Sequence, residues 1–401
     1  MDSPSRIVVT ATGIVSALGS GIDAQVAALR MGTSGLRYPQ LLETKHRDYP
    51  IGEVVESNDT MRAQLGLEHG DHPRTSLLAL AAMRDLVQQC GADRLKQERV
   101  ALINAGTVGG MGTVENFYMD FIEPGKTGDF ARHADCLSCA NSTQDIARYF
   151  GMRPVYQGTL STACSSSANA MIMGARLLRL GMADAAICGG VDSMSRFTLN
   201  GFLSLKNLDR DPCKPFDQNR NGLNLGEGAA YLMLEREEDA LARGATILAV
   251  LSGWANGNDT YHPTAPSPEG IGAAMTMQAA LDKANLAPEA IDYINAHGTA
   301  THANDLAEGR AIERVFGAGA CFSSTKPFTG HTLAAAGAIE AVLALGCMVE
   351  GFAPANQNFS EGMEEISARP IATNQQKDLR HVISNSFGFG GSNVSLVFSK
   401  P

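Results

Sequence analysis

Four short motifs place side chains that can do chemistry in this sequence of 401 residues. In the first, Thr162-Ala-Cys164-Ser-Ser-Ser167, a cysteine directly precedes a predicted helix over 166–180. Free backbone N–H groups and the positive end of the helix dipole favour the nucleophilic thiolate. The same N–H groups could bind a developing oxyanion. Taken alone, the motif is equally typical of a buried structural cysteine beside a serine-rich helix start.

The second motif, 295–301, and the third, 324–331, each contain a histidine and lie in the second half of the chain. His297 lies where a predicted strand ends in a glycine turn, so its side chain is expected to face a cleft, although a lone histidine is more often structural. His331 precedes a small-residue helix over 333–350, whose dipole should keep the imidazole neutral and able to donate its N–H. Lys326 lies just before His331. Glu340 lies in the predicted helix 333–350 and could reach back to Lys326.

The fourth motif is a glycine-rich stretch, 385–393, before the last predicted strand. Consecutive glycines permit positive φ angles and close approach of the backbone to a ligand. The Walker pattern, the dinucleotide fingerprint and the G-x-S-x-G elbow are missing, which argues against a phosphate loop or a serine hydrolase. Together, the four motifs suit a decarboxylating Claisen condensation. A cysteine takes an acyl group from a thioester, and two imidazoles stabilise the enolate that attacks it.

Composition narrows the class of protein. The net charge is −10 and no run of Lys and Arg stands out, which argues against nucleic-acid binding. Eight scattered cysteines fit a reducing, cytoplasmic location. Cys136 and Cys139 form a CxxC without a second ligand pair, so no metal site is expected. We expect neither a stretch of eighteen apolar residues nor, therefore, a membrane-spanning helix.

The elements that must position these residues alternate between β-rich and helical patterns, which predicts an α/β layered protein. Predicted strands are 7–10, 99–104, 185–188, 229–234, 247–259, 293–295 and 394–398, and predicted helices are 76–89, 166–180, 271–284, 304–315 and 333–350. Segments near 117–145 and 196–225 lack periodicity and are predicted to be loops that line a site.

The chain also repeats itself at long range. Residues 99–107 resemble residues 291–299, and an alanine-rich helical stretch precedes each copy. Such a repeat predicts two similar halves. We place them at 1–243, with Cys164, and 244–401, with both histidines.

In this order the four motifs resemble the β-ketoacyl-acyl-carrier-protein synthase family, of the elongating type, over residues 7–398. The resemblance implies a thiolase-like fold, an αβαβα sandwich of two pseudo-symmetric halves, assembled as a homodimer. It also implies roles: Cys164 as the acylated nucleophile, His297 and His331 as the enolate-stabilising pair, and Lys326, with its partner Glu340, as the residue that tunes the site electrostatically.

The resemblance implies further site residues. Asp305 and Glu308 match acidic residues that organise the site, and the backbone N–H groups of Cys164 and Phe389 would form an oxyanion hole. Phe389 would also gate the acyl chain, next to a mobile loop at 201–206. The implied substrate-binding residues are Thr299, Thr301, Phe202 and Gly390, and the implied carrier-protein contacts are Arg74, Lys126 and Lys206. No cofactor is implied, because phosphopantetheine arrives on the acyl-carrier protein.

The implied activity is that of a 3-oxoacyl-[acyl-carrier-protein] synthase in fatty-acid elongation, acting on malonyl and acyl thioesters. The alternative is a ketosynthase of a polyketide or aryl-polyene pathway, paired with a chain-length factor. A thiolase would need a second catalytic cysteine where Phe389 stands, and an initiating synthase would carry asparagine in place of His331. A chain-length factor would lack Cys164.

Overall fold

The computed structural model describes residues 5–67, 72–97, 99–122 and 133–401. Its main sheet has eleven strands, ordered β4-β3-β5-β6-β1-β7-β13-β12-β8-β9, with β2 paired to β1. The strands are β1 (Ile7–Ser16), β2 (Gly19–Ser20), β3 (Val100–Ala105), β4 (Tyr156–Leu160), β5 (Ala185–Asp192), β6 (Gly228–Arg236), β7 (Ala249–Asn258), β8 (Tyr293–Asn295), β9 (Phe322–Ser323), β12 (His381–Phe387) and β13 (Ser392–Ser399). A separate pair joins β10 (Phe352–Ala353) to β11 (Gln375–Gln376).

Helices cover both outer faces and fill the space between the two halves of the sheet. The α-helices are α1 (Ile22–Met31), α2 (Asn58–Leu65), α3 (Arg74–Cys90), α4 (Ala92–Leu95), α5 (Met111–Val114), α6 (Tyr118–Ile122), α8 (Ala140–Tyr149), α9 (Ser166–Arg179), α10 (Arg196–Ser204), α11 (Glu237–Ala242), α12 (Ile271–Ala284), α13 (His302–Phe316), α14 (Lys326–Thr329) and α15 (Ala336–Glu350). Short 3-10 turns are η1 (Ala134–Leu137), η2 (Pro288–Ala290), η3 (Leu333–Ala335) and η4 (Phe389–Gly391).

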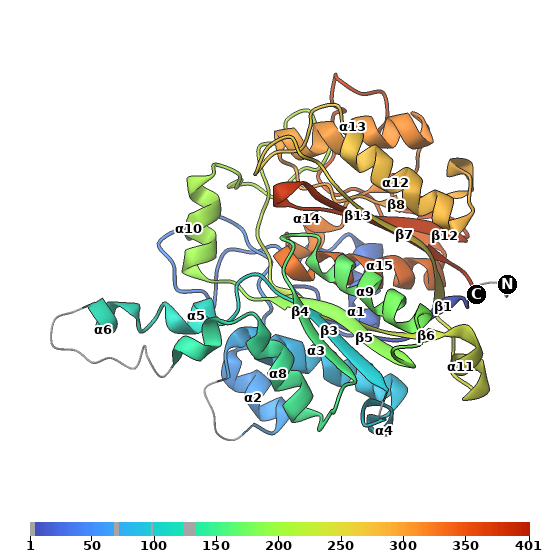
Figure 1. Cartoon of the computed structure of the whole chain (residues 1–401). Coiled ribbons are helices and arrows are strands. Elements are labelled where there is room, and N and C mark those ends of the chain that lie inside the picture. Colours follow the sequence, from blue (N-terminus) through green and yellow to red (C-terminus); the bar gives the residue numbers. More distant parts are fainter. Residues whose placement is uncertain (1–4, 68–71, 98, 123–132) are drawn as a thin grey trace.

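The layers follow an αβαβα order, visible from bottom to top in Figure 1. Helix α3 packs on β1 and β6, α9 and α15 lie in the middle, and α12 packs on β7 and β13. Pairing of Val8 and Val9 in β1 with Val250 and Ala249 in β7 joins the halves into one sheet. The predicted layered α/β fold is therefore confirmed. The boundary between residues 243 and 244 stays a prediction.

Helix α15 shows why the middle layer forms. From Ala336 to Met348 every residue is buried, because small side chains let the helix lie against sheet and helix on all sides. The window Leu333–Glu350 has a mean hydropathy of 1.8, enough by length and composition to cross a membrane. Our expectation that no such stretch exists was wrong. Because 89% of this window is buried inside the protein, we interpret it as a core helix.

The predicted helices and strands are found, but the two segments predicted to be loops contain helices. Helix α10 occupies the start of the segment 196–225, and α6, η1 and α8 occupy parts of 117–145. The buried side of helix α8 consists of Ser142, Thr143, Asp145, Ile146 and Ala147, and its polar members hide the helical pattern in the sequence. Residues 123–132 lie outside the described residues.

Candidate active site

Cys164 lies in a sharp turn between β4 and the start of α9. The preceding Ala163 has a φ of +52°, a strained value for a residue with a side chain, and the turn tips the thiol toward the second half of the chain. The Ser165 hydroxyl oxygen lies 2.8 Å from the Thr162 carbonyl oxygen, to which it donates, and 2.8 Å from the Ser392 hydroxyl, which ties this turn to β13. The cysteine itself is 7% exposed.

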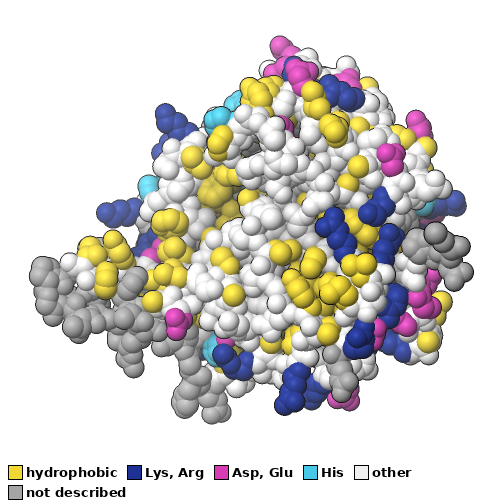
Figure 2. Space-filling view, in the orientation of Figure 1, with side chains coloured by type: hydrophobic (Ala, Val, Ile, Leu, Met, Phe, Trp, Pro, Cys, Tyr) yellow, Lys and Arg dark blue, Asp and Glu magenta, His cyan; other side chains and the backbone are white. Residues whose placement is uncertain are grey.

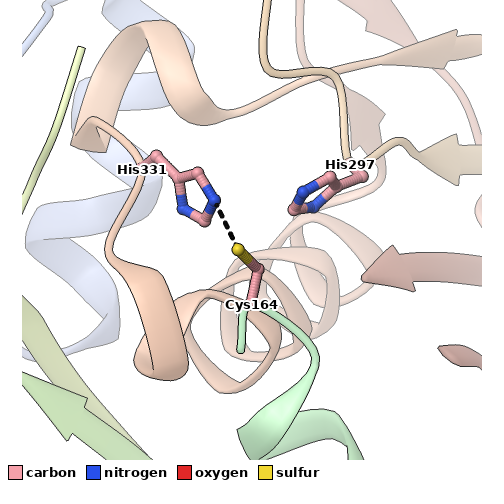
Figure 3. A group of neighbouring side chains, drawn as sticks. All are labelled: Cys164, His297 and His331. Carbon is pink, nitrogen blue, oxygen red and sulfur yellow. Dashed lines mark hydrogen bonds between the residues drawn. The ribbon is translucent and has the colours of Figure 1, made fainter. Parts of the chain in front are cut away.

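Both predicted histidines face this thiol, as Figure 3 shows. His331 Nε2 lies 3.1 Å from Cys164 Sγ, and the His297 and His331 rings are 5.3 Å apart at their centroids. Sequence positions 164, 297 and 331 are thus brought into one cluster by turns at the ends of three different elements.

Hydrogen bonds at the rear nitrogens set the tautomer of each imidazole. The Leu333 N–H donates to His331 Nδ1 at 3.2 Å, and the Lys326 ammonium donates to His297 Nδ1 at 3.2 Å. A neutral imidazole with an accepting Nδ1 carries its proton on Nε2. Both rings therefore point an Nε2–H donor into the site.

The two imidazoles are held in the neutral form. Burial lowers the pKa of His297 and of His331 well below the usual value, and the Lys326 charge lowers both further. The predicted neutral state of His331 agrees with this direction. Its main physical cause is burial, where we expected the helix dipole.

Lys326 and Glu340 form the predicted pair, and both are almost fully buried. The ammonium donates to Glu340 Oε1 and to the backbone carbonyl of His297 as well as to its ring. One lysine thus fixes the position and the charge state of His297. Burial raises the pKa of Glu340 to about 7, against the lowering effect of Lys326.

The expectation of a thiolate at Cys164 was wrong for the free protein. Burial raises the pKa of Cys164 to about 11, although the Lys326 charge and a hydrogen bond from the Phe389 N–H lower it. Glu340 and Asp192 raise it further. Desolvation of the thiolate therefore outweighs the favourable position at a helix start.

The turn after β8 is held by two buried carboxylates of α13. Glu308 accepts from the N–H groups of His297 and Gly298, both at 2.8 Å. Asp305 accepts from the N–H groups of Thr299 and Ala300 at 3.0 and 3.1 Å. These bonds satisfy every backbone donor from 297 to 300, which fits the organising role implied for both acids.

Phe389 and Phe202 stack at the mouth, with centroids 6.0 Å apart and an interplanar angle of 20°. Phe202 belongs to helix α10 rather than to a loop. A pocket of about 250 Å³ opens beside Cys164, and its lining includes Phe202, Lys206, His297, Thr299, Thr301, His331 and Phe389.

Two of the implied binding residues have other partners, and a third lies outside the described residues. Gly390 is outside the pocket lining: its N–H donates to Pro263 at 2.7 Å and its carbonyl accepts from Asn258. Arg74 does not fit a carrier contact, because its guanidinium binds the buried carboxylate of Glu227 and carries little exposed surface. Lys126 lies outside the described residues.

Asp192 was missed in the sequence. Its fully buried carboxylate accepts from the N–H groups of Thr107, Val108 and Ala334 and from the Thr107 hydroxyl. It thereby ties a turn of the first half to the turn that follows His331. The sequence did contain a signal for this role, because Asp192 is a charged residue at the end of an otherwise apolar predicted strand.

A metal ion fits poorly here. Cys164, His297 and His331 offer ligand atoms within 4.8 Å of one another, the one such group among the described residues. Coordination through Nε2 would require protonated Nδ1 atoms, which face the Leu333 and Lys326 donors. Cys136 and Cys139 are not part of this group.

Comparison with known proteins adds an independent result. Residues 4–240 match the family described as "Beta-ketoacyl synthase, N-terminal domain", and residues 248–360 match its C-terminal domain. The chain is 31% identical to a 3-oxoacyl-[acyl-carrier-protein] synthase 2 of Vibrio harveyi, over 99% of each chain. It is 32% identical to the protein of that name from Coxiella burnetii, over 98% of each.

Solved structures are similar over their whole length. One is titled "The ishigamide ketosynthase/chain length factor", with a TM-score of 0.90, 31% identity and full coverage of both chains. Another, the ketosynthase ApeO of Xenorhabdus doucetiae in complex with its chain length factor, has a TM-score of 0.85 and 34% identity, again with full coverage of both.

Proposed function

This chain belongs to the β-ketoacyl synthase family, and we propose that it condenses an acyl group held on Cys164 with malonyl-acyl-carrier protein. The observation that carries the proposal is the pair of neutral imidazoles beside the Cys164 sulfur: His331 Nε2 lies 3.1 Å from it, and a ring nitrogen of His297 lies within 4.8 Å. Neutral donors suit an enolate oxygen, because they stabilise developing charge without giving up a proton. The geometry thus serves both acyl transfer and decarboxylation at one position.

In the first half-reaction the Cys164 sulfur attacks the acyl thioester. The N–H groups of Cys164 and Phe389 would bind the oxyanion, and the carrier thiolate leaves and takes up the proton that Cys164 releases. Because the pKa of Cys164 is about 11, this proton must leave as the substrate binds.

In the second half-reaction the malonyl thioester loses CO2. The electron pair of the broken C–C bond forms an enolate whose oxygen accepts from His297 and His331. The enolate carbon then attacks the acyl-cysteine carbonyl, a C–C bond forms, and the Cys164 thiolate is expelled. The Cys164 thiolate takes up a proton from solvent, so the products are a 3-oxoacyl-carrier thioester, CO2 and the free enzyme with a Cys164 thiol.

Fatty-acid elongation is the first candidate pathway, supported by the names of the curated relatives. A polyketide or aryl-polyene pathway is the second, supported by the two ketosynthase structures that are titled with chain length factors. A panel of saturated and polyunsaturated acyl-carrier thioesters, with product analysis by mass spectrometry, separates them. Saturated substrates should react faster in the first case and polyunsaturated ones in the second.

The central test is acylation. Incubation with an acyl-carrier thioester should add the acyl mass to Cys164, and Cys164→Ala should remove both the adduct and condensation. An intact wild-type protein without any adduct would contradict the proposal.

The second test separates the half-reactions. His331→Ala should still be acylated on Cys164, while decarboxylation of malonyl-carrier protein should fall by about 100-fold or more because one enolate donor is lost. Decarboxylation at the wild-type rate would rule out the paired-donor account.

The remaining expectations stay proposals. The phosphopantetheine arm of the carrier would pass Thr299 and Thr301 in the pocket, so no separate cofactor is needed. Lys206, exposed at the pocket mouth, is the described candidate for contact with an acidic carrier. A cytoplasmic location fits this chemistry. The homodimer implied by the resemblance also stays a proposal.

A further inference from the structure

Asp192, at the end of β5, is an acidic side chain without any exposed surface. Figure 2 shows other Asp and Glu side chains on the surface, where water hydrates their charge. Burial of a carboxylate is unfavourable unless hydrogen bonds compensate for the lost water. The condensation proposed above gives Asp192 no role, so the reason for its burial must lie in what its hydrogen bonds hold.

Four of the described hydrogen bonds reach this carboxylate, and in each the neighbour is the donor. The N–H groups of Thr107 and Val108 donate to one oxygen at 2.9 and 3.0 Å. The Thr107 hydroxyl and the Ala334 N–H donate to the other oxygen at 2.5 and 2.8 Å. An ionised carboxylate accepts such bonds best, and they oppose the burial that raises the pKa of Asp192. The bonds therefore favour a charged carboxylate inside the protein.

The bond from Ala334 holds a strained turn directly after His331. Leu333 has a φ of +53°, a value that a leucine rarely adopts, so its surroundings must keep it there. The N–H of Leu333 donates to His331 Nδ1 at 3.2 Å, and the next N–H, that of Ala334, donates to Asp192. The Leu333 side chain is buried in one cluster with Met194. Asp192 supplies the acceptor that the backbone of this turn needs.

We propose that Asp192 is a positioning residue for decarboxylation, because it holds the turn that keeps His331 Nε2 protonated as an enolate donor. This inference rests on the proposed condensation. Without the acceptor, Leu333 can relax toward a negative φ, and its N–H no longer fixes His331 Nδ1. The imidazole then populates both neutral tautomers, and only one of them offers an Nε2–H to the enolate oxygen.

The same carboxylate has the opposite effect on the nucleophile. Burial is the main reason for the raised pKa of Cys164, and the negative charge of Asp192 adds to it. Asp192 therefore assists decarboxylation while it restrains formation of the Cys164 thiolate. A residue that merely supported the fold would affect both reactions in the same direction.

Asp192→Asn removes the charge and places an NH2 group against one of the donors. Decarboxylation of malonyl-carrier protein should fall about tenfold or more, because one enolate donor is no longer fixed. Alkylation of Cys164 by iodoacetamide at a fixed pH should become about threefold faster, because a negative charge near the thiol is gone. The ¹⁵N ring signals of His331, assigned by their absence from His331→Ala, should change from one neutral tautomer to a mixture. Asp192→Glu restores a charged acceptor and should move all three readouts back toward wild type.

Asp217→Asn is the matched control. Asp217 is equally buried and also accepts from three N–H groups and one hydroxyl, those of Asn219, Ser360 and Glu361. It is not part of the pocket lining. This variant should lose stability but keep the alkylation rate and the ratio of decarboxylation to acylation.

Equal losses of acylation and decarboxylation with an unchanged alkylation rate would overturn the proposal, as would the same response in both variants. If Asp192→Asn does not fold, Thr107→Val removes only the hydroxyl bond to the same carboxylate. It should slow decarboxylation without faster alkylation, and wild-type decarboxylation in this variant would also overturn the proposal. If the wild type itself does not decarboxylate malonyl-carrier protein, the proposed condensation fails, while the alkylation rates and the His331 tautomer still decide on Asp192.

Discussion

At the scale of single residues, the reactivity of Cys164 results from opposed effects on one thiol. Burial is the largest and disfavours the thiolate, while the Lys326 charge and the Phe389 N–H favour it. Glu340 acts against its own partner Lys326, because its negative charge raises the pKa of Cys164. The ion pair behind His297 therefore adjusts the nucleophile as well as the histidine.

Alkylation by iodoacetamide should report this balance. Because the pKa of Cys164 is about 11, the rate should rise about tenfold per pH unit from pH 7 to about 10, as the thiolate fraction grows. Lys326→Met should slow alkylation at a fixed pH, and Glu340→Gln should speed it. A plateau below pH 9, or equal effects of both substitutions, would contradict this account.

The same two variants should lose stability, since each leaves a buried charge without its partner. We expect a loss of about 3–5 kcal/mol for each in chemical denaturation. The double variant Lys326→Met with Glu340→Gln should recover part of that loss, because neither charge then remains. A double variant less stable than both singles would show that the pair is not the relevant unit.

At the scale of elements, helix α13 positions the turn that carries His297. Its carboxylates act as fixed acceptors for four successive N–H groups, so the turn has one conformation rather than several. Glu308 and Asp305 do not touch the thiol. They act through the backbone of the residues that do.

Glu308→Gln should expose this positioning role. One amide orientation or the other must place an NH2 group against a backbone N–H, so we expect slower decarboxylation with acylation of Cys164 retained. Stability should fall by about 1–3 kcal/mol. Glu313→Gln on the same helix, where the carboxylate contacts only Ser367 in the described structure, should leave both half-reactions unchanged. Equal losses in both half-reactions would favour a merely structural role.

The other element that shapes the site is α10, through Phe202. The Phe202 ring packs on Phe389 and against the buried cluster of Met194 and Leu199, so it separates the thiol from an apolar region. Phe202→Ala should widen this passage and raise kcat/KM for a dodecanoyl over a hexanoyl carrier thioester. The iodoacetamide rate should stay the same, because the Phe389 N–H is unaltered. An unchanged chain-length ratio would exclude Phe202 as a gate.

At the scale of the whole molecule, the catalytic groups meet because two buried helices of different halves pack closely. Helix α9 follows Cys164, α15 follows His331, and Gly337 in α15 lies against α9. A Cβ at Gly337 would come within 2.9 Å of the Ala168 side chain and of the Ser386 hydroxyl. The close approach of backbone to side chain is what only glycine permits here.

Gly337→Ala should therefore lower the free energy of unfolding by about 1–3 kcal/mol through overpacking, and slow both half-reactions together. Gly319→Ala is the matched control, since a Cβ there meets nothing within 4 Å. Chemical denaturation and acylation rates measure the two effects. A Gly337→Ala protein as stable and active as the control would show that the helices can move apart without cost.

The sequence by itself determined the family, the layered fold and the chemical identity of Cys164, His297, His331 and the Lys326–Glu340 pair. These follow from local motifs and from hydrophobic periodicity, which belong to short stretches of chain. Tertiary structure decided what depends on neighbours distant in sequence. Burial reversed the expected charge state of the Cys164 thiol, and Glu227 claimed the Arg74 side chain. Long-range packing also placed Arg179 of α9 and Lys283 of α12 over the Trp254 ring of β7, a contact that forms only after the chain has folded.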